Sequence, residues 1–202
     1  MIAVIDMKLG NVHSVCNALK YLGYDHILTS SPEQLSSSEK LIFPGVGSFS
    51  EASARLFKSG IRDSIRREVM EKNKPILGIC LGMQLLAEEG EEGGLSKGLG
   101  LIDARVSKLR CDTTLFRLPH IGWNDVTNSG ISVFNGVEDG SCFYFVHSYE
   151  MVLREKCLFA TSNYGVDFVA AVQKGHILGT QFHPEKSREK GLRVLRNFVE
   201  NF

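Results

Sequence analysis

In the N-terminal half of the chain, short apolar runs alternate with segments in which apolar residues recur at helical spacing. Three runs have the length and composition of buried strands: residues 2–5, 40–43 and 75–79. Three segments have the spacing of helices, the second with a break at Gly60: residues 12–22, 50–70 and 81–87. Because such alternation is typical of parallel strands joined by crossover helices, we expect a parallel α/β sheet here.

The C-terminal half follows a different pattern. Residues 88–100 are acidic and rich in glycine, and we expect them to form an exposed loop. Beyond it, runs separated mostly by Gly, Asn or Asp turns predict strands at 101–109, 121–127, 142–149, 157–162, 168–173 and 176–182. Residues 187–202 have the pattern of an amphipathic helix. With 202 residues, against about 150 per domain, we expect one α/β domain over residues 1–202 with an antiparallel addition.

Composition and charge exclude several classes of function. Lys and Arg total 23, as do Asp and Glu, so the chain has no net positive charge with which to bind nucleic acid or an anionic membrane. No apolar run approaches the ~18 residues of a membrane span, and residues 1–6 lack the basic start of a signal peptide. The five cysteines are scattered, without C-x-x-C spacing. We therefore expect a cytoplasmic protein with free thiols and no metal.

The most informative segment is Gly78-Ile-Cys80-Leu-Gly82, at the junction of a predicted strand and a predicted helix. A sharp strand-to-helix turn strains the backbone of its central residue, and small residues two positions away on either side avoid clashes with it. The turn also places the sulfur over the first turn of a helix, where free N–H groups favour a thiolate and bind an oxyanion. A buried structural cysteine between packing glycines explains this pentapeptide equally well.

A second segment, Gly179-Thr-Gln-Phe-His183-Pro-Glu185, changes that balance. In an extended chain residues i and i+2 point to the same side, so Glu185 can orient the imidazole of His183 and stabilise its protonated form. Alone, His183 would be an ordinary polar residue at a strand end. Together with Cys80 it favours a nucleophile, base and orienting carboxylate at the carboxyl ends of strands.

A third segment, Pro44-Gly-Val46-Gly47, ends the strand at residues 40–43. Its glycines allow a close approach to a ligand or a peptide flip, which suits a second oxyanion N–H beside that of Leu81. A plain Pro-Gly turn is the alternative for the tetrapeptide in isolation.

Together with three longer segments, these motifs resemble the class I (triad) glutamine amidotransferase family, and within it the glutaminase subunits of imidazole glycerol phosphate synthase. The longer segments are Pro119-His-Ile-Gly-Trp-Asn124, Tyr144-Phe-Val-His-Ser-Tyr149 and Gly179-Thr-Gln-Phe-His-Pro-Glu-Lys-Ser187. The likeness covers nearly the whole chain. It implies a three-layer, flavodoxin-like α/β fold with a mostly parallel central sheet, flanking helices and an antiparallel β addition.

The resemblance also implies a role for each motif residue. Cys80 would attack the side-chain amide of L-glutamine, His183 would act as base and then acid, and Glu185 would orient His183. Oxyanion donors would be the N–H groups of Leu81 and Val46. Glutamine would be held by Gly47, Gln84, Ser148 and Tyr149. The ammonia would pass to a (β/α)8-barrel cyclase subunit in a heterodimer that forms imidazole glycerol phosphate for histidine biosynthesis, and no cofactor is implied.

Residues of the partner interface follow from the same resemblance: Asn11, Trp123, Asn124 and Lys186. From the residues alone, a single tryptophan in a strand is as well explained by a core position, and Lys186 by a solvated surface lysine. The family usually has glycine where this chain has Lys8, and Glu150 stands where an aromatic or basic residue is expected. Both departures leave open a paralogue whose ammonia goes to another synthase, such as a surface-polysaccharide sugar amidotransferase.

Two further classes of function remain open on the residues alone: a cysteine peptidase or γ-glutamyl hydrolase, and a non-catalytic regulatory subunit. The presence of Cys80, His183 and Glu185 together argues against the regulatory subunit, and substrate preference would separate a peptidase from a glutaminase. We expect His120 and His147 to serve as hydrogen-bonding supports. The acidic run at 88–92 is expected to be solvated and not to bind a metal.

Overall fold

The computed structural model describes residues 1–202 apart from residues 9, 11 and 129. Asn11, one of the residues predicted at the partner interface, therefore lies outside the described part of the chain. The description that follows concerns the remaining residues.

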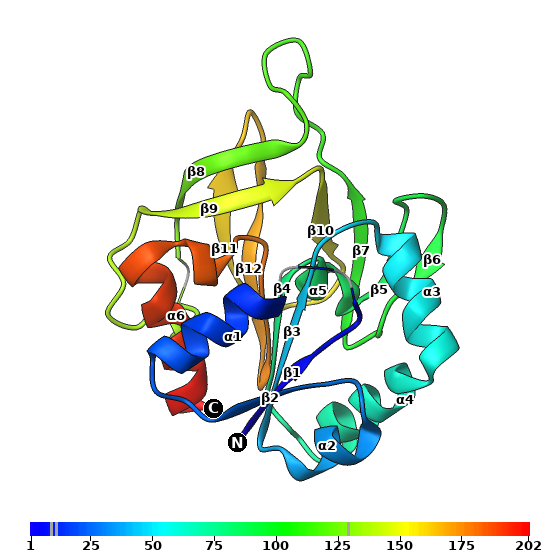
Figure 1. Ribbon diagram of the computed structural model, residues 1–202. Coiled ribbons are helices and arrows are strands. Elements are labelled where there is room, and N and C mark those ends of the chain that lie inside the picture. The colour runs from blue at the N-terminus through cyan, green and yellow to red at the C-terminus, as the bar shows by residue number, and fades with distance from the viewer. Residues whose placement is uncertain (9, 11, 129) are drawn as a thin grey trace.

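A seven-stranded sheet with the strand order β11-β12-β13-β4-β3-β1-β2 forms the middle layer (Figure 1). Strands β13, β4, β3, β1 and β2 are mutually parallel, whereas β12 and β11 are added antiparallel. Their bounds are β1 Ile2–Ile5, β2 His26–Thr29, β3 Lys40–Gly45, β4 Ile76–Cys80, β11 Leu158–Asn163, β12 Asp167–Lys174 and β13 Ile177–Thr180. The predicted mostly parallel sheet with an antiparallel addition is confirmed.

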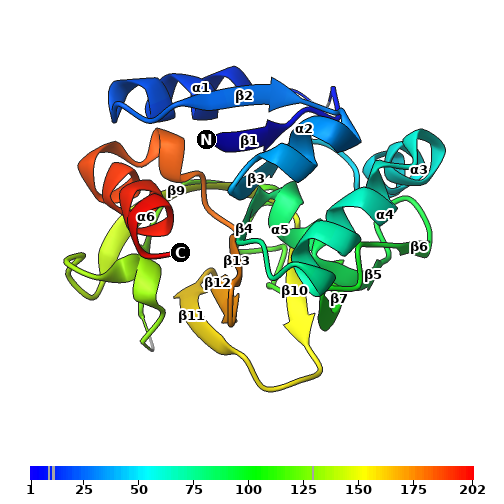
Figure 2. The same cartoon turned by 90° about the horizontal axis from the view of Figure 1, so that it is seen from below.

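Helices cover both faces of this sheet, as the view from below shows (Figure 2). Alternate residues of β1 belong to different cores: Ala3 and Ile5 pack with the first cluster, Ile2 and Val4 with the second. The first core contains buried residues of α2, α3, α4 and α5, and the second contains those of α1 and α6. The helix bounds are α1 Val12–Tyr21, α2 Pro32–Ser37, α3 Phe49–Ser59, α4 Ile61–Arg66, α5 Leu81–Leu85 and α6 Arg188–Asn201. This is the predicted three-layer arrangement, because a strand with two apolar faces needs a helical layer on each.

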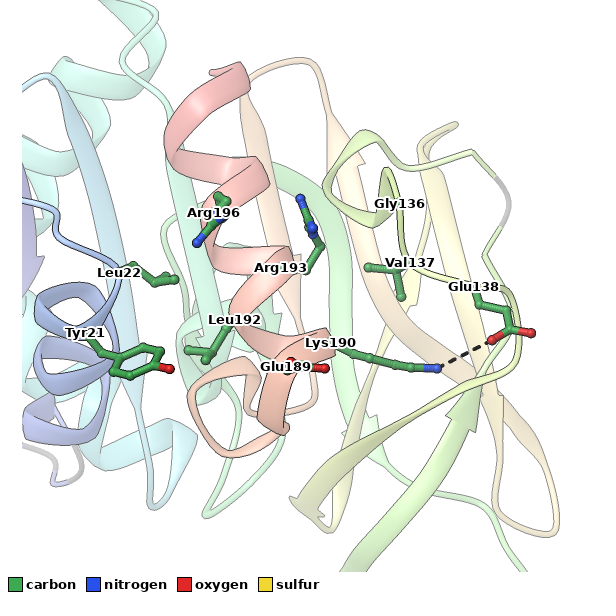
Figure 3. Close-up of a pocket in the computed structure, with 10 residues that line it drawn as sticks. All are labelled: Tyr21, Leu22, Gly136, Val137, Glu138, Glu189, Lys190, Leu192, Arg193 and Arg196. Carbon is green, nitrogen blue, oxygen red and sulfur yellow. Dashed lines mark ion pairs between the residues drawn. The ribbon is translucent and has the colours of Figure 1, made fainter.

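Three short helical turns complete the set: the π-helical turn η1 Arg67–Glu71 and the 3-10 turns η2 Ser132–Phe134 and η3 Pro184–Lys186. A cavity of about 510 Å³ lies along α6, between the end of α1 and residues 136–138 beyond η2 (Figure 3). Lys190 pairs with Glu138 across it at 3.8 Å, and Arg193 and Arg196 line it as well.

Two smaller sheets extend the fold. One has the order β10-β7-β5-β6, and the other is the antiparallel pair β8-β9. Their bounds are β5 Ala87–Gly90, β6 Ser96–Lys97, β7 Ile102–Lys108, β8 His120–Val126, β9 Ser141–His147 and β10 Tyr149–Leu153. The expectation of an exposed loop over 88–100 was wrong for β5 and β6, because β5 pairs with β7 and Gly90 is buried under the ring of Phe49. Strand β10 was missed as a separate strand, since only its pairing with β7 distinguishes it from β9.

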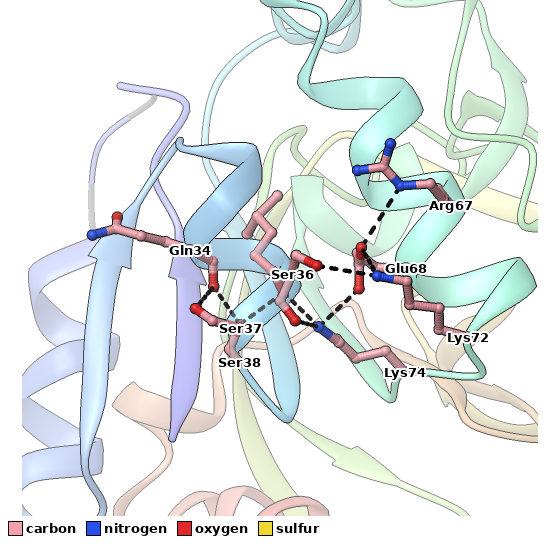
Figure 4. Close-up of polar contacts among 9 residues, drawn as sticks. Gln34, Ser36, Ser37, Ser38, Arg67, Glu68, Lys72 and Lys74 are labelled. Atoms are coloured by element: carbon pink, nitrogen blue, oxygen red, sulfur yellow. Dashed lines mark hydrogen bonds and ion pairs between the residues drawn. The ribbon is translucent and has the colours of Figure 1, made fainter.

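A buried ion pair holds α2 against η1 (Figure 4). Lys74 Nζ lies 2.9 Å from Glu68 Oε2 and donates to the carbonyl oxygens of Leu35 and Ser36 at 2.5 and 2.9 Å. Burial raises the pKa of Glu68, but hydrogen bonds and charges from Lys72 and Lys74 outweigh it and hold that pKa below its ordinary value. Glu68 holds Lys74 in place, and the hydrogen bonds from Lys74 fix the end of α2, a helix that the sequence pattern did not predict. Removing one partner of such a buried pair costs about 3–5 kcal/mol.

Within the described residues, none of the helices has the length and apolar character needed to cross a membrane.

Candidate active site

Cys80 occupies the sharp turn between β4 and α5. Its backbone has φ 55° and ψ −112°, in the left-handed half of conformational space that a non-glycine residue rarely adopts. The two flanking glycines allow the turn: a Cβ on Gly82 would lie 1.7 Å from the carbonyl oxygen of Phe43, and one on Gly78 would lie 2.7 Å from the backbone of Gly82. The turn therefore requires α5 to lie directly against β3, which leaves no room for a side chain at either position.

His183 follows β13 and is 1% exposed. Its Nδ1 lies 2.8 Å from Oε1 of Glu185 in the turn η3, and its backbone N–H donates to the carbonyl of Tyr144 at 2.9 Å. Burial lowers the pKa of His183, yet hydrogen bonding and charge from Cys80 and Glu185 outweigh it and raise that pKa to about 10. The imidazolium is therefore stabilised between a sulfur and a carboxylate.

Three groups surround the sulfur of Cys80. The thiol donates to the carbonyl oxygen of Val146 at 3.6 Å, and Nε2 of Gln181 donates to the sulfur at 3.7 Å. The third is His183, because hydrogen bonding and charge from Cys80 contribute to its raised pKa. Because Nδ1 of His183 is bonded to Glu185, the buried Nε2 is the nitrogen left for proton transfer.

A cavity of about 470 Å³ opens beside Cys80, and every residue predicted for glutamine and oxyanion binding lines it. These residues are Val46, Gly47, Leu81, Gln84, Ser148 and Tyr149. They come from the segment after β3, from α5 and from the junction of β9 and β10. The cavity along α6 contains none of them.

Glu92 also lines the cavity beside Cys80, which corrects the expectation of a fully solvated acidic run. Its Oε2 accepts the backbone N–H of Phe49, the first residue of α3, at 2.8 Å. The local sequence contains no signal for this contact, because acidic residues in a Gly-rich stretch are usually solvated. The pairing of β5 with β7 brings the segment that contains Glu92 next to the cavity.

The described residues predicted at a partner interface, Trp123, Asn124 and Lys186, do not line the cavity and lie on and beside the hairpin β8-β9. Trp123 is 46% exposed, so the alternative of a core tryptophan does not hold. Lys186 is exposed and lies 5.7 Å from the ring centre of Tyr144. Asn124 instead faces the protein, and its Nδ2 donates to the carbonyl of Asn163 at 2.7 Å.

The two departures from the family pattern have different structural consequences. Lys8 keeps φ 56°, the left-handed conformation that a glycine adopts readily, and its N–H donates to Asp6 Oδ1 at 2.7 Å. The carbonyl of Lys8 accepts from Nη1 of Arg55 in α3 at 3.0 Å, so one local contact and one contact from a distant helix hold this conformation. Glu150 is half-buried, and burial raises its pKa.

Comparison with known proteins identifies the class. Residues 3–202 match the family model of glutamine amidotransferase class-I. The fold superposes on the structure of PurLQS from Thermotoga maritima with a TM-score of 0.75 at 19% identity, over 99% of this chain and 97% of that one. The chain belongs to the class-I glutamine amidotransferases.

Sequence relatives narrow the class further. The chain is 44% identical over 200 residues to the imidazole glycerol phosphate synthase subunit HisH 1 of Campylobacter jejuni (strain RM1221), covering 98% of this chain and 99% of that protein. It is 45% identical over 199 residues to the subunit HisH of Bacillus mycoides (strain KBAB4), covering 98% and 93%. Within the class, the chain is thus similar to HisH subunits over nearly its full length.

Titration of His183 tests the electrostatics of the site. We expect the imidazole to stay protonated until about pH 10, and Glu185→Gln and Cys80→Ala each to lower its pKa, because each removes a group that stabilises the cation. The pKa of His183 in the folded protein lies above the unfolded value of about 6.5. Protonated His183 therefore stabilises the fold fully below pH ~6.5, and this stabilisation is lost as the pH rises through about 10.

The measurement is NMR of the His183 imidazole during a pH titration, with Cys157→Ala as the control. A pKa near 6.5 in the unaltered chain would contradict the arrangement.

Proposed function

We propose that this chain is the glutaminase subunit of an imidazole glycerol phosphate synthase, which hydrolyses L-glutamine to glutamate and ammonia and acts in histidine biosynthesis. Relatives of 44–45% identity over nearly the whole chain bear that subunit name. The observation that carries the proposal is Cys80, strained at its turn, beside the buried pair of His183 and Glu185 and open to a cavity. We take residues 1–202 as one glutaminase domain.

The proposed reaction proceeds through a thioester. The Cys80 thiolate attacks the side-chain amide carbon of glutamine, and the carbonyl oxygen becomes an oxyanion facing the N–H groups of Leu81 and Val46. As the C–N bond breaks, His183 donates its proton to the leaving nitrogen, which departs as ammonia. Water then attacks the carbonyl carbon of the γ-glutamyl thioester, and His183 takes up its proton. The C–S bond breaks, which releases glutamate and regenerates the Cys80 thiolate. Glu185 holds His183 in one orientation through both steps.

The lining of the cavity suggests how glutamine is held. Gly47, Ser148 and Tyr149 line the cavity, and we assign their backbone groups to glutamine binding. Glu92 also lines it, and its carboxylate can accept hydrogen bonds from the α-ammonium group of an amino acid. The amide nitrogen of Gln84 already donates to Tyr149 O at 3.0 Å and to Gln181 Oε1 at 3.0 Å. We therefore assign Gln84 to holding the wall of the cavity, with Glu92 as the charged contact to substrate.

The proposed partner is a (β/α)8-barrel cyclase subunit in a cytoplasmic heterodimer. The outer face of the hairpin β8-β9 carries two exposed apolar residues, Ile121 at 59% and Trp123 at 46% exposure. The same hairpin contributes Val146, whose carbonyl contacts Cys80, so a partner on this face would lie close to the site that releases ammonia. Exposed aromatic residues of this kind often carry much of the binding energy of an interface.

Loss of the nucleophile tests the reaction. We expect Cys80→Ala to remove glutamine hydrolysis by about 10⁴-fold or more, because the members of a catalytic triad act as a unit. Cys157→Ala, a half-buried cysteine away from the site, should keep full activity. Ammonia and glutamate release by the complex measure the effect, with peptides as alternative substrates. Residual hydrolysis within tenfold of the unaltered enzyme would contradict the role of Cys80, and cleavage of peptides would indicate a peptidase.

Glu92 provides a test of the substrate class. Because an ion-assisted hydrogen bond contributes about 1.5–3 kcal/mol, Glu92→Gln should raise KM for glutamine about 10- to 100-fold with little change in kcat. Hydrolysis of an analogue that lacks the α-amino group should respond much less. Glu88→Gln, whose carboxylate lies 4.0 Å from Arg154, is the control and should leave KM unchanged. An equal rise in KM for both substrates would contradict a contact between Glu92 and the α-ammonium group.

The partner is tested with Trp123, the single tryptophan of the chain. Adding the barrel cyclase should raise glutamine turnover at least tenfold, and Trp123→Ala should weaken the complex tenfold or more. Tyr21→Ala, which alters an aromatic residue 79% exposed at the end of α1, should have no effect. Binding by titration calorimetry and turnover measure both changes. If a sugar amidotransferase but not the cyclase stimulates turnover, the ammonia acceptor is the alternative that Lys8 and Glu150 left open.

A further inference from the structure

A buried hydrogen-bond chain connects the outer hairpin with the nucleophile. We propose that His120 and His147 are positioning residues of the glutaminase site and that Gln181, which contacts the sulfur of Cys80, is a further catalytic residue. The hydrogen-bond chain joins all three from Asn124 to Cys80 and fixes the positions of Tyr149 and the sulfur. The inference rests on the proposed function, because it assigns these residues to that same site. His120 and His147 act through Tyr149, whereas Gln181 contacts the sulfur of Cys80 directly. His147 lines the cavity beside Cys80, and we assign it no contact with glutamine.

The outer half of the chain has a fixed direction. His147 Nδ1 lies 2.9 Å from Tyr149 O, and a carbonyl only accepts, so Nδ1 carries the hydrogen. In a neutral His147 the other nitrogen, Nε2, is then an acceptor, and it lies 3.0 Å from His120 Nδ1, which must therefore donate. His120 Nε2 is left as an acceptor at 3.5 Å from the amide nitrogen of Asn124.

The orientation of the Asn124 amide is set independently. Its Nδ2 donates to the carbonyl of Asn163 at 2.7 Å, and its Oδ1 accepts the backbone N–H of Asp125 at 2.9 Å. The nitrogen that faces His120 is thus a donor, as the direction of the chain requires. Asn124 precedes Asp125 and follows Trp123 on β8, so the chain begins on the strand that we assign to partner binding.

The inner half runs from Tyr149 to the sulfur. Tyr149 O accepts a second hydrogen bond, from Gln84 Nε2 at 3.0 Å, so both of its lone pairs are used. Gln84 Nε2 also donates to Gln181 Oε1 at 3.0 Å, and Gln181 Nε2 donates to Cys80 Sγ at 3.7 Å. When the thiol loses its proton, its bond to Val146 O is lost, and the Gln181 amide remains as a donor to the thiolate.

Burial and ring packing keep the two imidazoles neutral and in place. His120 is 2% exposed and stacks on Tyr164, with ring centres 4.0 Å apart, and on Phe145 at 5.1 Å. Burial lowers the pKa of His120 to about 4 and that of His147 to about 3; a nearby charge on His120 or His183 also disfavours protonation of His147. A proton on His147 would set two N–H groups against each other. The chain is therefore intact at neutral pH.

These polar side chains lie deep in the core, where each polar group needs a hydrogen-bond partner. Gln181 is 0% exposed and His147 5%, and an unpaired polar group at such depth costs about 1–3 kcal/mol. Apolar residues of the same size would avoid that cost altogether. What the polar residues add is direction, because each donor in the chain defines where the next acceptor must lie.

The tautomers test the chain without any measurement of catalysis. In the unaltered chain labelled with ¹⁵N-histidine, we expect NMR at pH 7 to show His120 and His147 both neutral and both protonated on Nδ1. Spectra of His120→Gln and of His147→Gln assign the signals. An Nε2–H tautomer or a cation at either ring overturns the proposal, and this outcome is independent of whether the protein hydrolyses glutamine.

Kinetics of the complex with its partner test both roles. Gln181→Met should lower kcat at least tenfold with KM within about twofold, because it removes the donor to the sulfur. His120→Phe, which keeps the ring stacking, should instead raise KM for glutamine at least threefold. It removes the hydrogen bond that orients His147, and His147 in turn holds the carbonyl of Tyr149, a residue that we assign to glutamine binding. His120→Gln, which restores a donor and an acceptor, should recover part of that loss. Thr180→Val is the control: its buried hydroxyl donates to Phe182 O outside the chain, and kcat and KM should not change.

A double-mutant cycle decides whether the two halves act as one. His120 and Gln181 are four hydrogen bonds apart along the chain. Distant, independent sites contribute additively, so their losses in kcat/KM would multiply. We expect the loss in the double variant to be at least threefold smaller than the product of the single losses. Losses that multiply, or Gln181→Met with unchanged kcat in a folded protein, overturn the proposal. If His120→Phe does not fold, the tautomers of the unaltered chain decide.

Discussion

The contact between the start of α5 and strand β3 is the constraint on which the rest of the site depends. A hydrogen on Gly82 in place of a side chain lets the helix lie against the carbonyl of Phe43, where a Cβ would come within 1.7 Å of the oxygen. Only with this approach can the chain turn within one residue from β4 into α5 and hold Cys80 at φ 55°. Such a strained backbone conformation persists only where many surrounding contacts hold it in place. Here the surroundings are a sheet with helices on both faces.

The strained turn places the sulfur where several strands end. Register pairs Gly45 of β3 with Cys80 of β4, and Thr180 of β13 with Ile79, so the segments after β3 and β13 meet at the nucleophile. The segment after β3 supplies Val46 and Gly47 to the cavity. The segment after β13 supplies Gln181, which donates to the sulfur, and His183, whose pKa is raised in part by Cys80. This is the usual place for a site in an open α/β sheet, at the carboxyl edge of parallel strands. The antiparallel hairpin β8-β9 adds the remaining side and, through Val146, a carbonyl at the sulfur.

Charge is distributed unequally around this centre. On one side His183 is stabilised as a cation by Glu185 and by the sulfur, whereas on the other side His120 and His147 are kept neutral by burial. Three buried histidines thus take two protonation states because one has a carboxylate neighbour at 2.8 Å and the other two face carbonyl, amide and imidazole groups. The difference separates proton transfer from positioning within one small volume.

The sequence by itself determined the parts of the protein that rest on local rules. Short apolar runs predicted β1, β3 and β4, and apolar residues at helical spacing predicted the helices α1, α3, α4, α5 and α6. The pentapeptide around Cys80 and the spacing of His183 and Glu185 indicated the reactive groups, since the chemistry depends on neighbours two residues apart. Family resemblance then predicted the cavity-lining positions Gly47, Gln84, Ser148 and Tyr149.

Tertiary structure alone decided what depends on contacts between distant segments. Strands β2, β5, β6 and β10 are short and gain their identity from pairing, and α2 is held by Lys74 and Glu68 from another part of the chain. Glu92 joins the cavity only because β5 folds back along β7, and the roles of His120 and Gln181 appear only in the hydrogen bonds that connect them. A local sequence pattern indicates which faces of a helix or strand are apolar. It does not indicate which distant donor and acceptor form a hydrogen bond, because these pairs form only when the layers pack together.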